Sequence, residues 1–224
     1  VRALVEDKSL SKQLAEHLNM KTANWVVASK EYPLSKNPPF TGKYFVKPRF
    51  GSASIGIDET SLCDTWDDAI KQSKMYFENN IDVIVEQYIE GLCYGVSILN
   101  TISGDPLISI PHYTVSNKSG NIMTYSQKRF AEEGMKRVDS EDVILNEQLT
   151  YLAKQYFKEM QPCDYARIDF IVDDKSKIPY FLEVNALMNL GIHGGFVNSF
   201  LKSHFNSYDE ILPFMNDKAD SMNG

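Results

Sequence analysis

Two neighbouring segments late in the chain constrain its fold more than any other feature, because each has the pattern of a β-strand and a short polar turn joins them. Side chains alternate between the two faces of a strand, so Arg167 and Asp169 lie on one face of the first strand. By the same rule Phe181, Glu183 and Asn185 share a face of the second strand. The pattern predicts an antiparallel hairpin with charged and amide groups gathered on one side.

The register of this hairpin decides what the polar residues can do. A turn centred near residues 175–176 places Asp169 opposite Glu183 and Arg167 opposite Asn185. Like charges directly opposite each other cost roughly 0.2–1 kcal/mol in a sheet, and a cation between them would remove that cost. Carboxylate and amide oxygens select hard cations such as Mg²⁺. From the hairpin alone, a magnesium site and a solvated surface hairpin with an Arg167 salt bridge both remain open.

A second polar feature follows the apolar strand that ends at Lys47 and Pro48. The loop after this strand is rich in small residues, namely Gly51, Ser52, Ala53, Ser54 and Gly56. Small residues let backbone N–H groups approach an anion closely, and a lysine at the root of the loop adds a positive charge for phosphate. The lysine precedes the glycines, so the order of a P-loop is absent. A simple turn is the alternative interpretation.

Further positive charges lie where they could reach a nucleotide. Lys8 lies at the entrance of a predicted helix, where a positive charge is slightly unfavourable to the helix dipole. Lys128 lies in a long polar segment that is typical of a functional loop. For both residues a solvated lysine is the alternative. The apolar strand that runs into Gln87 could offer backbone groups to a purine, or could simply be a buried core strand.

Strand and helix patterns occur in clusters rather than in strict alternation, which favours an α+β fold with antiparallel sheets over a doubly wound parallel sheet. Helices are predicted at 7–20, 65–79, 140–160 with Ser140 as cap, 195–203 and 208–215, and strands at 24–29, 43–48, 55–58, 82–87, 94–101, 106–115, 164–173 and 178–184. Residues 116–138 are predicted to be irregular.

Composition excludes several classes of partner. The formal charge of −7 argues against nucleic acid or an anionic membrane as the main partner. No apolar run approaches the roughly 20 residues that a membrane span needs. The three cysteines are far apart, which is typical of reduced thiols. We therefore expect a cytoplasmic protein.

Six motifs in chain order resemble those of the ATP-grasp enzymes, and most closely the D-alanine–D-alanine ligases. They are Asp7-Lys8, Phe45–Pro48, Gly51–Gly56, Val85–Gly91, Arg167–Phe170 and Glu183–Asn185. The resemblance covers about residues 7–200. It implies an ATP-grasp fold with a first lobe at 1–92 and a second lobe at 93–224, and it implies that the N-terminal substrate domain of the family is absent from this chain.

The resemblance also implies roles for individual residues. Lys8 and Lys47 would bind the ATP phosphates, and the loop with Gly51, Ser54 and Gly56 would cover them. Glu86, Gln87 and Ile89 would line the adenine site. Asp169, Glu183 and Asn185 would hold Mg²⁺, with Mn²⁺ as an alternative. The expected catalytic residues are Arg167, Lys128 and Ser52.

The mechanism of the family is phosphoryl transfer from ATP to a carboxylate, followed by attack of an amine on the acyl phosphate. By this resemblance the partners would be small amino-acid substrates, with a homodimer as one option for the assembly. Two positions depart from the family pattern. Cys93 replaces a glutamate that contacts the ATP ribose, and Gly194 replaces a serine that helps to bind the substrate carboxylate, so the substrate could differ from D-alanine. A small-molecule kinase and a non-catalytic nucleotide-binding module are the alternative functions.

Overall fold

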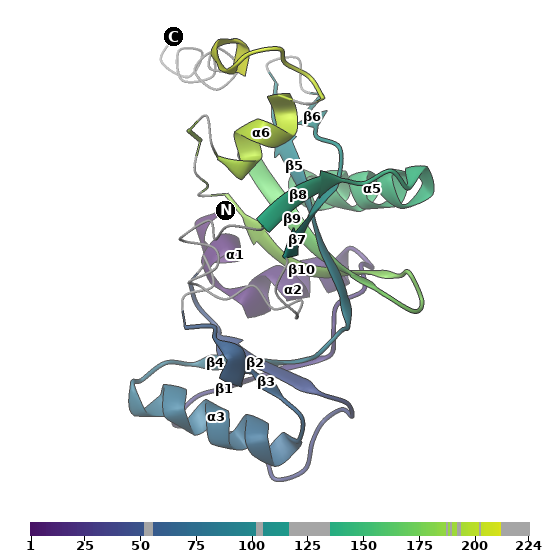
Figure 1. Cartoon of the computed structure of the whole chain (residues 1–224). Helices are drawn as coiled ribbons and strands as arrows, with labels where there is room; N and C mark the ends of the chain where they lie inside the picture. The colour runs from purple at the N-terminus through teal and green to yellow at the C-terminus, as the bar shows by residue number, and fades with distance from the viewer. Residues whose placement is uncertain are drawn as a thin grey trace.

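The computed structural model describes residues 1–51, 56–101, 105–116, 135–186, 188, 190–191, 194–201 and 203–211. Two antiparallel sheets organise these residues, with strand orders β1-β4-β2-β3 and β10-β9-β5-β7-β8, and β6 pairs with β5 (Figure 1). The smaller sheet contains β1 (Trp25–Ala28), β2 (Tyr44–Pro48), β3 (Leu62–Cys63) and β4 (Val83–Gln87). The larger sheet contains β5 (Gly91–Leu99), β6 (Leu107–Ile108), β7 (His112–Ser116), β8 (Met135–Asp139), β9 (Tyr165–Asp173) and β10 (Pro179–Asn185). The predicted α+β class is confirmed.

Helix α3 (Trp66–Glu78) covers the outer face of the smaller sheet (Figure 1). It begins after Thr65, whose side chain accepts a hydrogen bond from the backbone N–H of Asp68. Trp66 and Phe77 are buried against the sheet, as the spacing of apolar residues predicts. The opposite face of this sheet is therefore turned toward α2 and the larger sheet.

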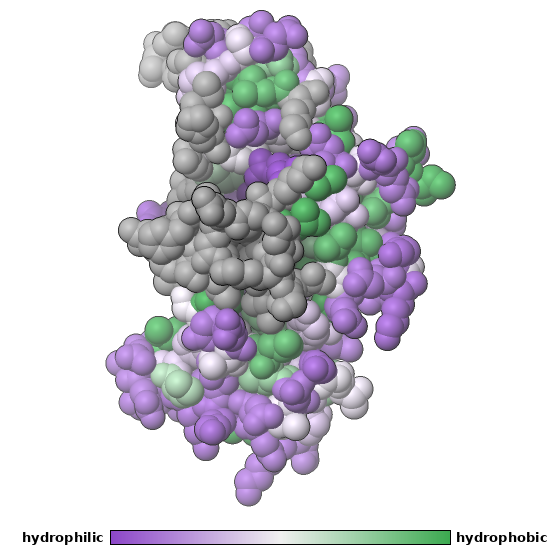
Figure 2. All heavy atoms as spheres, in the orientation of Figure 1, coloured by the Kyte–Doolittle hydropathy of each residue, from purple (hydrophilic) through white to green (hydrophobic). Residues whose placement is uncertain are grey.

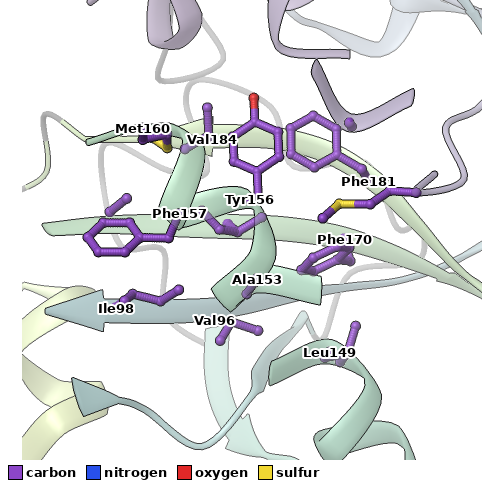
Figure 3. Packing of buried hydrophobic residues seen from close by; sticks show 14 of the residues in the cluster. Val96, Ile98, Leu149, Ala153, Tyr156, Phe157, Met160, Phe170, Phe181 and Val184 are labelled. Atoms are coloured by element: carbon purple, nitrogen blue, oxygen red, sulfur yellow. The ribbon is translucent and has the colours of Figure 1, made fainter. Parts of the chain in front are cut away.

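Helix α5 (Val143–Glu159) packs on one face of the larger sheet. Its Ala153 and Tyr156 are fully buried in a cluster with Val96 and Phe170 of the sheet (Figure 3). Tyr156 stacks on Phe181 of β10, with ring centroids 4.7 Å apart. The other face of β5, β9 and β10 is left for polar groups, and α6 (Gly195–Leu201) packs near one end of it.

The N-terminal helices α1 (Arg2–Glu6) and α2 (Lys8–His17) pack with the larger sheet. Val5 and Ala15 belong to the same hydrophobic cluster as α5, and the hydroxyl of Tyr156 donates to the carbonyl of Ser11 at 3.1 Å. The predicted division into lobes at residue 92 stays a prediction.

The segment between α2 and β1 connects the two sheets through backbone hydrogen bonds. The N–H of Phe181 in β10 donates to the carbonyl of Lys21 at 2.8 Å, and the N–H of Gln87 in β4 donates to the carbonyl of Asn24 at 2.7 Å. The short stretch from Lys21 to Asn24 thus reaches from one sheet to the other and fixes β10 relative to β4.

Several predicted element boundaries are wrong. The cap of α5 is Asp142 rather than Ser140, because the Asp142 carboxylate accepts from the N–H of Leu145 at 3.0 Å, whereas Ser140 is buried and its own N–H donates to the carbonyl of Pro111. The predicted irregular segment contains β8, a polar edge strand without apolar alternation.

Two other predicted strands also differ. The predicted strand at 106–115 is divided into β6 and β7, which both pair with β5. Of the predicted strand at 55–58, residues 56–58 are turn and coil, and the chain next joins the sheet as β3. The helix predicted at 208–215 is helical at 208–211, and the rest lies outside the described residues.

The surface over the smaller sheet and α3 is mainly hydrophilic (Figure 2). None of the helices in the described part of the chain is long and apolar enough to cross a membrane.

Asp7 joins the N-terminal helices to the end of β2. Its carboxylate caps α2 by accepting from the N–H of Ser9 at 2.9 Å, and it forms a two-point ion pair with Arg49 at 3.0 and 2.8 Å. Burial raises the pKa of Asp7, but the hydrogen bonds from Arg49 and Ser9 lower it by more, to about 2. This carboxylate is therefore ionised at all but the most acidic pH.

Replacing Asp7 by Asn keeps a good helix cap and removes the charge that pairs with Arg49. Because the folded pKa of about 2 is below the unfolded value, we expect the ion pair to contribute about 1–3 kcal/mol above pH 4, and this contribution to disappear as the pH falls toward 2. Urea unfolding of wild type and Asp7→Asn at several pH values measures the difference. A difference that does not shrink with falling pH would contradict the ion pair.

Candidate nucleotide and metal site

A β-bulge in β10 sets the register of the predicted hairpin. Phe181 pairs with Phe170, the register shifts between Phe181 and Glu183, and Glu183 then pairs with Asp169. The prediction that Phe181 shares a face with Glu183 is wrong, because Phe181 is 1% exposed in the core below α5. The extra residue of the bulge resets the alternation. The predicted pairing of Asp169 with Glu183 and of Arg167 with Asn185 is confirmed.

Arg167 and Asp169 form a two-point ion pair at the centre of this face. The guanidinium donates from Nε to Oδ1 and from Nη2 to Oδ2 of Asp169, both at 2.7 Å. Asn185 Nδ2 donates to Asp169 Oδ2 at 3.0 Å and to Glu183 Oε1 at 3.4 Å. The Asp169 carboxylate raises the pKa of Arg167, so the guanidinium is a fixed positive charge here.

The same residues suit a hard divalent cation. Each carboxylate oxygen has two lone pairs, so Asp169 Oδ1, which accepts one hydrogen bond, keeps a position for a metal. The nitrogen and oxygen of the Asn185 side-chain amide occupy equivalent positions. Rotating this amide by half a turn would therefore direct its oxygen toward a metal ion. No group of three or more His, Cys, Asp or Glu in the described ranges could hold a metal. An ion at this hairpin would therefore take two carboxylates and draw its other ligands from elsewhere.

Gly95 makes room for the polar groups on this face. It lies in β5 between Asp169 of β9 and His112 of β7. A Cβ atom at Gly95 would lie 3.0 Å from Arg167 Cδ, 3.2 Å from Asp169 Oδ1 and 3.2 Å from His112 Nε2. Any larger residue at position 95 would therefore push against the side chains of Arg167, Asp169 and His112.

The facing side of the smaller sheet carries a buried cluster of three charges. Glu86 Oε1 lies 3.0 Å from Lys47 Nζ and 3.2 Å from Lys12 Nζ, which comes from α2. Lys12 is 0%, Lys47 3% and Glu86 4% exposed. Lys12 lies within ion-pair distance of Glu86 but without hydrogen-bond geometry. Two ammonium groups share one carboxylate, so the cluster has an excess positive charge.

The pKa values of this cluster follow from burial and from its charges. Burial raises the pKa of Glu86, but Lys12 and Lys47 lower it by more, so the carboxylate is ionised. Burial lowers the pKa of Lys12 and Glu86 opposes this effect. Lys12 was not predicted as a site residue, although it shares Glu86 with the predicted Lys47.

Lys8 lies beside the start of the glycine-containing loop. Lys8 is the first residue of α2, and its Nζ donates to the carbonyl of Gly51 at 2.6 Å. Gly51 and Gly56 have φ values of +93° and +76°, the left-handed region that favours glycine. The predicted residues Ser52, Ser54 and Lys128 lie outside the described residues.

The two remaining predicted residues lie at the end of β4 and just after it. Gln87 Oε1 accepts from Asn24 Nδ2 at 2.8 Å, which adds a side-chain bond to the backbone connection between these residues. Ile89 is half-buried in the connection between β4 and β5. Glu86, Gln87 and Ile89 thus lie along one strand end, and their place at an adenine ring stays a prediction.

We expect the stability of the protein to depend on the buried cluster of Lys12, Lys47 and Glu86. Glu86→Gln leaves two buried ammonium groups without their carboxylate, and we expect it to lower the free energy of unfolding by about 3–5 kcal/mol. Urea unfolding at neutral pH measures this change.

Lys12→Met is the matched variant, because it leaves a one-to-one pair of Lys47 and Glu86. We expect a smaller loss than for Glu86→Gln, and the double variant to be more stable than Glu86→Gln alone. Equal losses in the two single variants would show that the charge balance does not control the cluster.

Comparisons with known proteins agree with this arrangement. The family model of the D-Ala–D-Ala ligase C-terminus matches residues 8–202. A D-alanine–D-alanine ligase of Clostridium perfringens strain SM101 is 25% identical over 224 residues, which cover 99% of this chain and 70% of that protein. A D-alanine–D-alanine ligase of Bacillus anthracis is 27% identical over 183 residues, which cover 81% of this chain and 56% of that protein.

Solved structures show the same fold. The D-alanine–D-alanine ligase of Bacillus anthracis complexed with ATP has a TM-score of 0.74 at 20% identity, over 99% of this chain and 69% of that chain. The VanG D-Ala:D-Ser ligase of Enterococcus faecalis has a TM-score of 0.72 at 19% identity, over 95% of this chain and 61% of that chain. The chain spans 56–70% of the length of these four relatives.

The predicted ATP-grasp fold is confirmed by this structural likeness. Because the family model covers most of the sequence, the chain belongs to the D-Ala–D-Ala ligase C-terminal family.

Proposed function

We propose that this chain is the ATP- and metal-binding part of an ADP-forming ligase that activates a carboxylate and joins it to an amine. The observation that carries the proposal is the convergence of Arg167, Asp169, Glu183 and Asn185 on one face of the larger sheet. A fixed cation beside two carboxylates matches what phosphoryl transfer needs from a protein, which is positioning and charge stabilisation.

The nucleotide would bind between the two sheets. We assign its phosphates to Lys8 and Lys47 and to the loop with Gly51, Ser52, Ser54 and Gly56. The excess positive charge around Glu86 supports this assignment, and so does the structural likeness to the Bacillus anthracis ligase complexed with ATP. Lys128, from outside the described residues, would reach the same phosphates. We assign the adenine to the strand end with Glu86, Gln87 and Ile89.

Asp169, Glu183 and Asn185 would hold Mg²⁺, with Mn²⁺ as an alternative. When bound, the ion would neutralise phosphate charge and align the phosphates for transfer. Two carboxylates and one amide leave its remaining positions for phosphate oxygens and water, which is the usual coordination of Mg²⁺ in proteins.

In the proposed reaction, an oxygen of the substrate carboxylate attacks the γ-phosphorus of ATP, and ADP leaves. The amine nitrogen then attacks the carbonyl carbon of the acyl phosphate, phosphate leaves, and the nitrogen loses a proton. Arg167 stays protonated beside Asp169, so it can stabilise negative charge on the reacting oxygens through both steps.

The names of the relatives point to the substrate class. They are D-alanine–D-alanine ligases, and one is a D-Ala:D-Ser ligase. We therefore propose amino acids as both substrates, with D-alanine as the first candidate. Because the reaction consumes ATP, we place it in the cytoplasm. The division into a first lobe at 1–92 and a second lobe at 93–224 remains our proposal, although α1 and α2 share a hydrophobic cluster with the larger sheet. The homodimer stays a prediction.

The proposed function is tested by measuring ADP release from the full-length protein over a panel of amino acids with saturating Mg·ATP. We expect ADP release that depends on an amino acid, and a dipeptide detectable by mass spectrometry. A phosphorylated product without an amide would indicate the kinase alternative. ATP binding without turnover would indicate a non-catalytic module.

Asp169→Asn tests the metal assignment, and Asp173→Asn is its matched control. Both positions are in β9, but Asp173 lies at the hairpin turn, where it accepts from the N–H and hydroxyl of Ser176 at 2.6 and 2.7 Å. Loss of one metal-binding charge should lower amino-acid-dependent ADP release by about 100-fold or more.

The Asp173→Asn protein should stay within about twofold of wild type, because surface substitutions outside the site change little. Equal activities of the two variants would remove Asp169 from the metal site.

A further inference from the structure

Arg137 of the edge strand β8 lies on the same face of the larger sheet as Asp169. Along one row across the sheet, Asp139 pairs with His112, His112 with Gly95, and Gly95 with Asp169. Residues paired in this way share a face, and Arg137 is two residues from Asp139 on the same strand. Arg137 therefore belongs to the polar face that carries the Arg167–Asp169 pair.

The Arg137 side chain extends from β8 to the first residue of α6. Its Nη1 donates to the carbonyl of Gly195 at 2.5 Å. A Cβ atom at Gly195 would lie 2.1 Å from Nη2 and 2.9 Å from Cζ. An alanine at this position would therefore force the Arg137 guanidinium to move away from its present place.

The guanidinium of Arg137 lacks a carboxylate partner in the described structure. Arg2, Arg49 and Arg167 each form an ion pair with Asp or Glu. Arg137 forms none among the described residues, and its buried Nε has no hydrogen-bond acceptor there. Burial lowers the pKa of Arg137 and the nearby Arg167 lowers it further, while the charges of Asp139 and Asp169 partly oppose this. A largely buried guanidinium with no ion pair and no acceptor for its Nε among the described residues is costly unless an anion binds to it.

The order of the strands indicates which anion this is. The carboxylates assigned to the metal are in β9 and β10 at one edge of the sheet, and Arg137 enters from β8 at the opposite edge. The phosphates of ATP are assigned to the lysines between the sheets. One further anion takes part in the proposed reaction. The amino acid that supplies the amine has a carboxylate that does not react, and this carboxylate stays negatively charged throughout.

We propose that Arg137 binds the carboxylate of the amine substrate, and thereby selects an amino acid over an uncharged amine. This inference rests on the proposed ligase function. A guanidinium offers several N–H donors in one plane, which suits two-point binding of a carboxylate. Arg137 is then a specificity-determining residue, while Arg167 acts on the reacting groups.

The test is a competition between two amines in the full-length protein. D-Alanine and D-alaninamide are supplied together with Mg·ATP, and mass spectrometry gives the ratio of D-alanyl-D-alaninamide to D-alanyl-D-alanine. The amide has no carboxylate, so it can act only as the amine substrate. Where the amino-acid panel selects another amino acid, that amino acid and its amide replace this pair.

Arg137→Gln should shift the product ratio toward the amide by about tenfold or more, the size expected for one lost charge-assisted hydrogen bond. Arg137→Lys should shift it less. Gly195→Ala should shift it in the same direction as Arg137→Gln, because the methyl group would occupy the place of the guanidinium. The ratio does not depend on the fraction of folded enzyme, and ATP affinity should be unchanged in all three variants.

An active protein whose product ratio is the same in wild type and Arg137→Gln would overturn the role of Arg137, and would make it a structural link between β8 and α6. A wild-type protein that forms no amide with any amino acid would refute the proposed function, and this inference with it.

Discussion

The rest of the site depends on the two-point ion pair between Arg167 and Asp169. Both residues are in β9, and the two neighbouring strands hold the pair in place. Gly95 of β5 leaves space for it, and Asn185 of β10 donates a hydrogen bond to the Asp169 carboxylate. The bulge in β10 is what makes this possible. It lets Phe181 stay in the core against Tyr156 while Glu183 turns to the opposite face beside Asp169. Core packing and site geometry are thus set by one extra residue in one strand.

The smaller sheet faces these groups with a buried cluster of two lysines and one glutamate. Lys12 and Lys47 share Glu86 in a nearly dry environment, where a charge without a partner is expensive. Lys12 comes from α2, which packs in the core of the larger sheet, so the cluster is also a contact between the two halves of the molecule. An anion bound there would interact with groups whose positions the fold already determines, and little energy would be lost in ordering them.

The fold class, the hairpin register and its acidic pair could be predicted from the sequence, because strand alternation and a short turn are local properties. The bulge could not, since an extra residue in a strand depends on what the partner strands bury. Lys12 could not either: a lysine in an amphipathic helix is expected to be solvent-exposed, and only its partner Glu86, which is distant in the sequence, makes its burial tolerable. The position of Arg137 on the sheet could not be predicted, because β8 is a polar edge strand without the apolar alternation that identifies a strand.

The distribution of charged side chains across the larger sheet explains why one face could bind both a metal ion and a carboxylate. Arg167 and Asp169 neutralise each other near the middle. Glu183 adds negative charge at the β10 edge, and the β8 edge carries Arg137 together with Asp139, two residues away on the same face. Neither edge can compensate the other through direct contact, because β9, β5 and β7 separate them. The β10 edge is therefore suited to a cation, and the unsatisfied donor of Arg137 at the β8 edge is suited to an anion. A carboxylate that reacts beside Arg167 would lie between the two, so metal ligands on one side and guanidinium donors on the other could hold a charged substrate in one orientation.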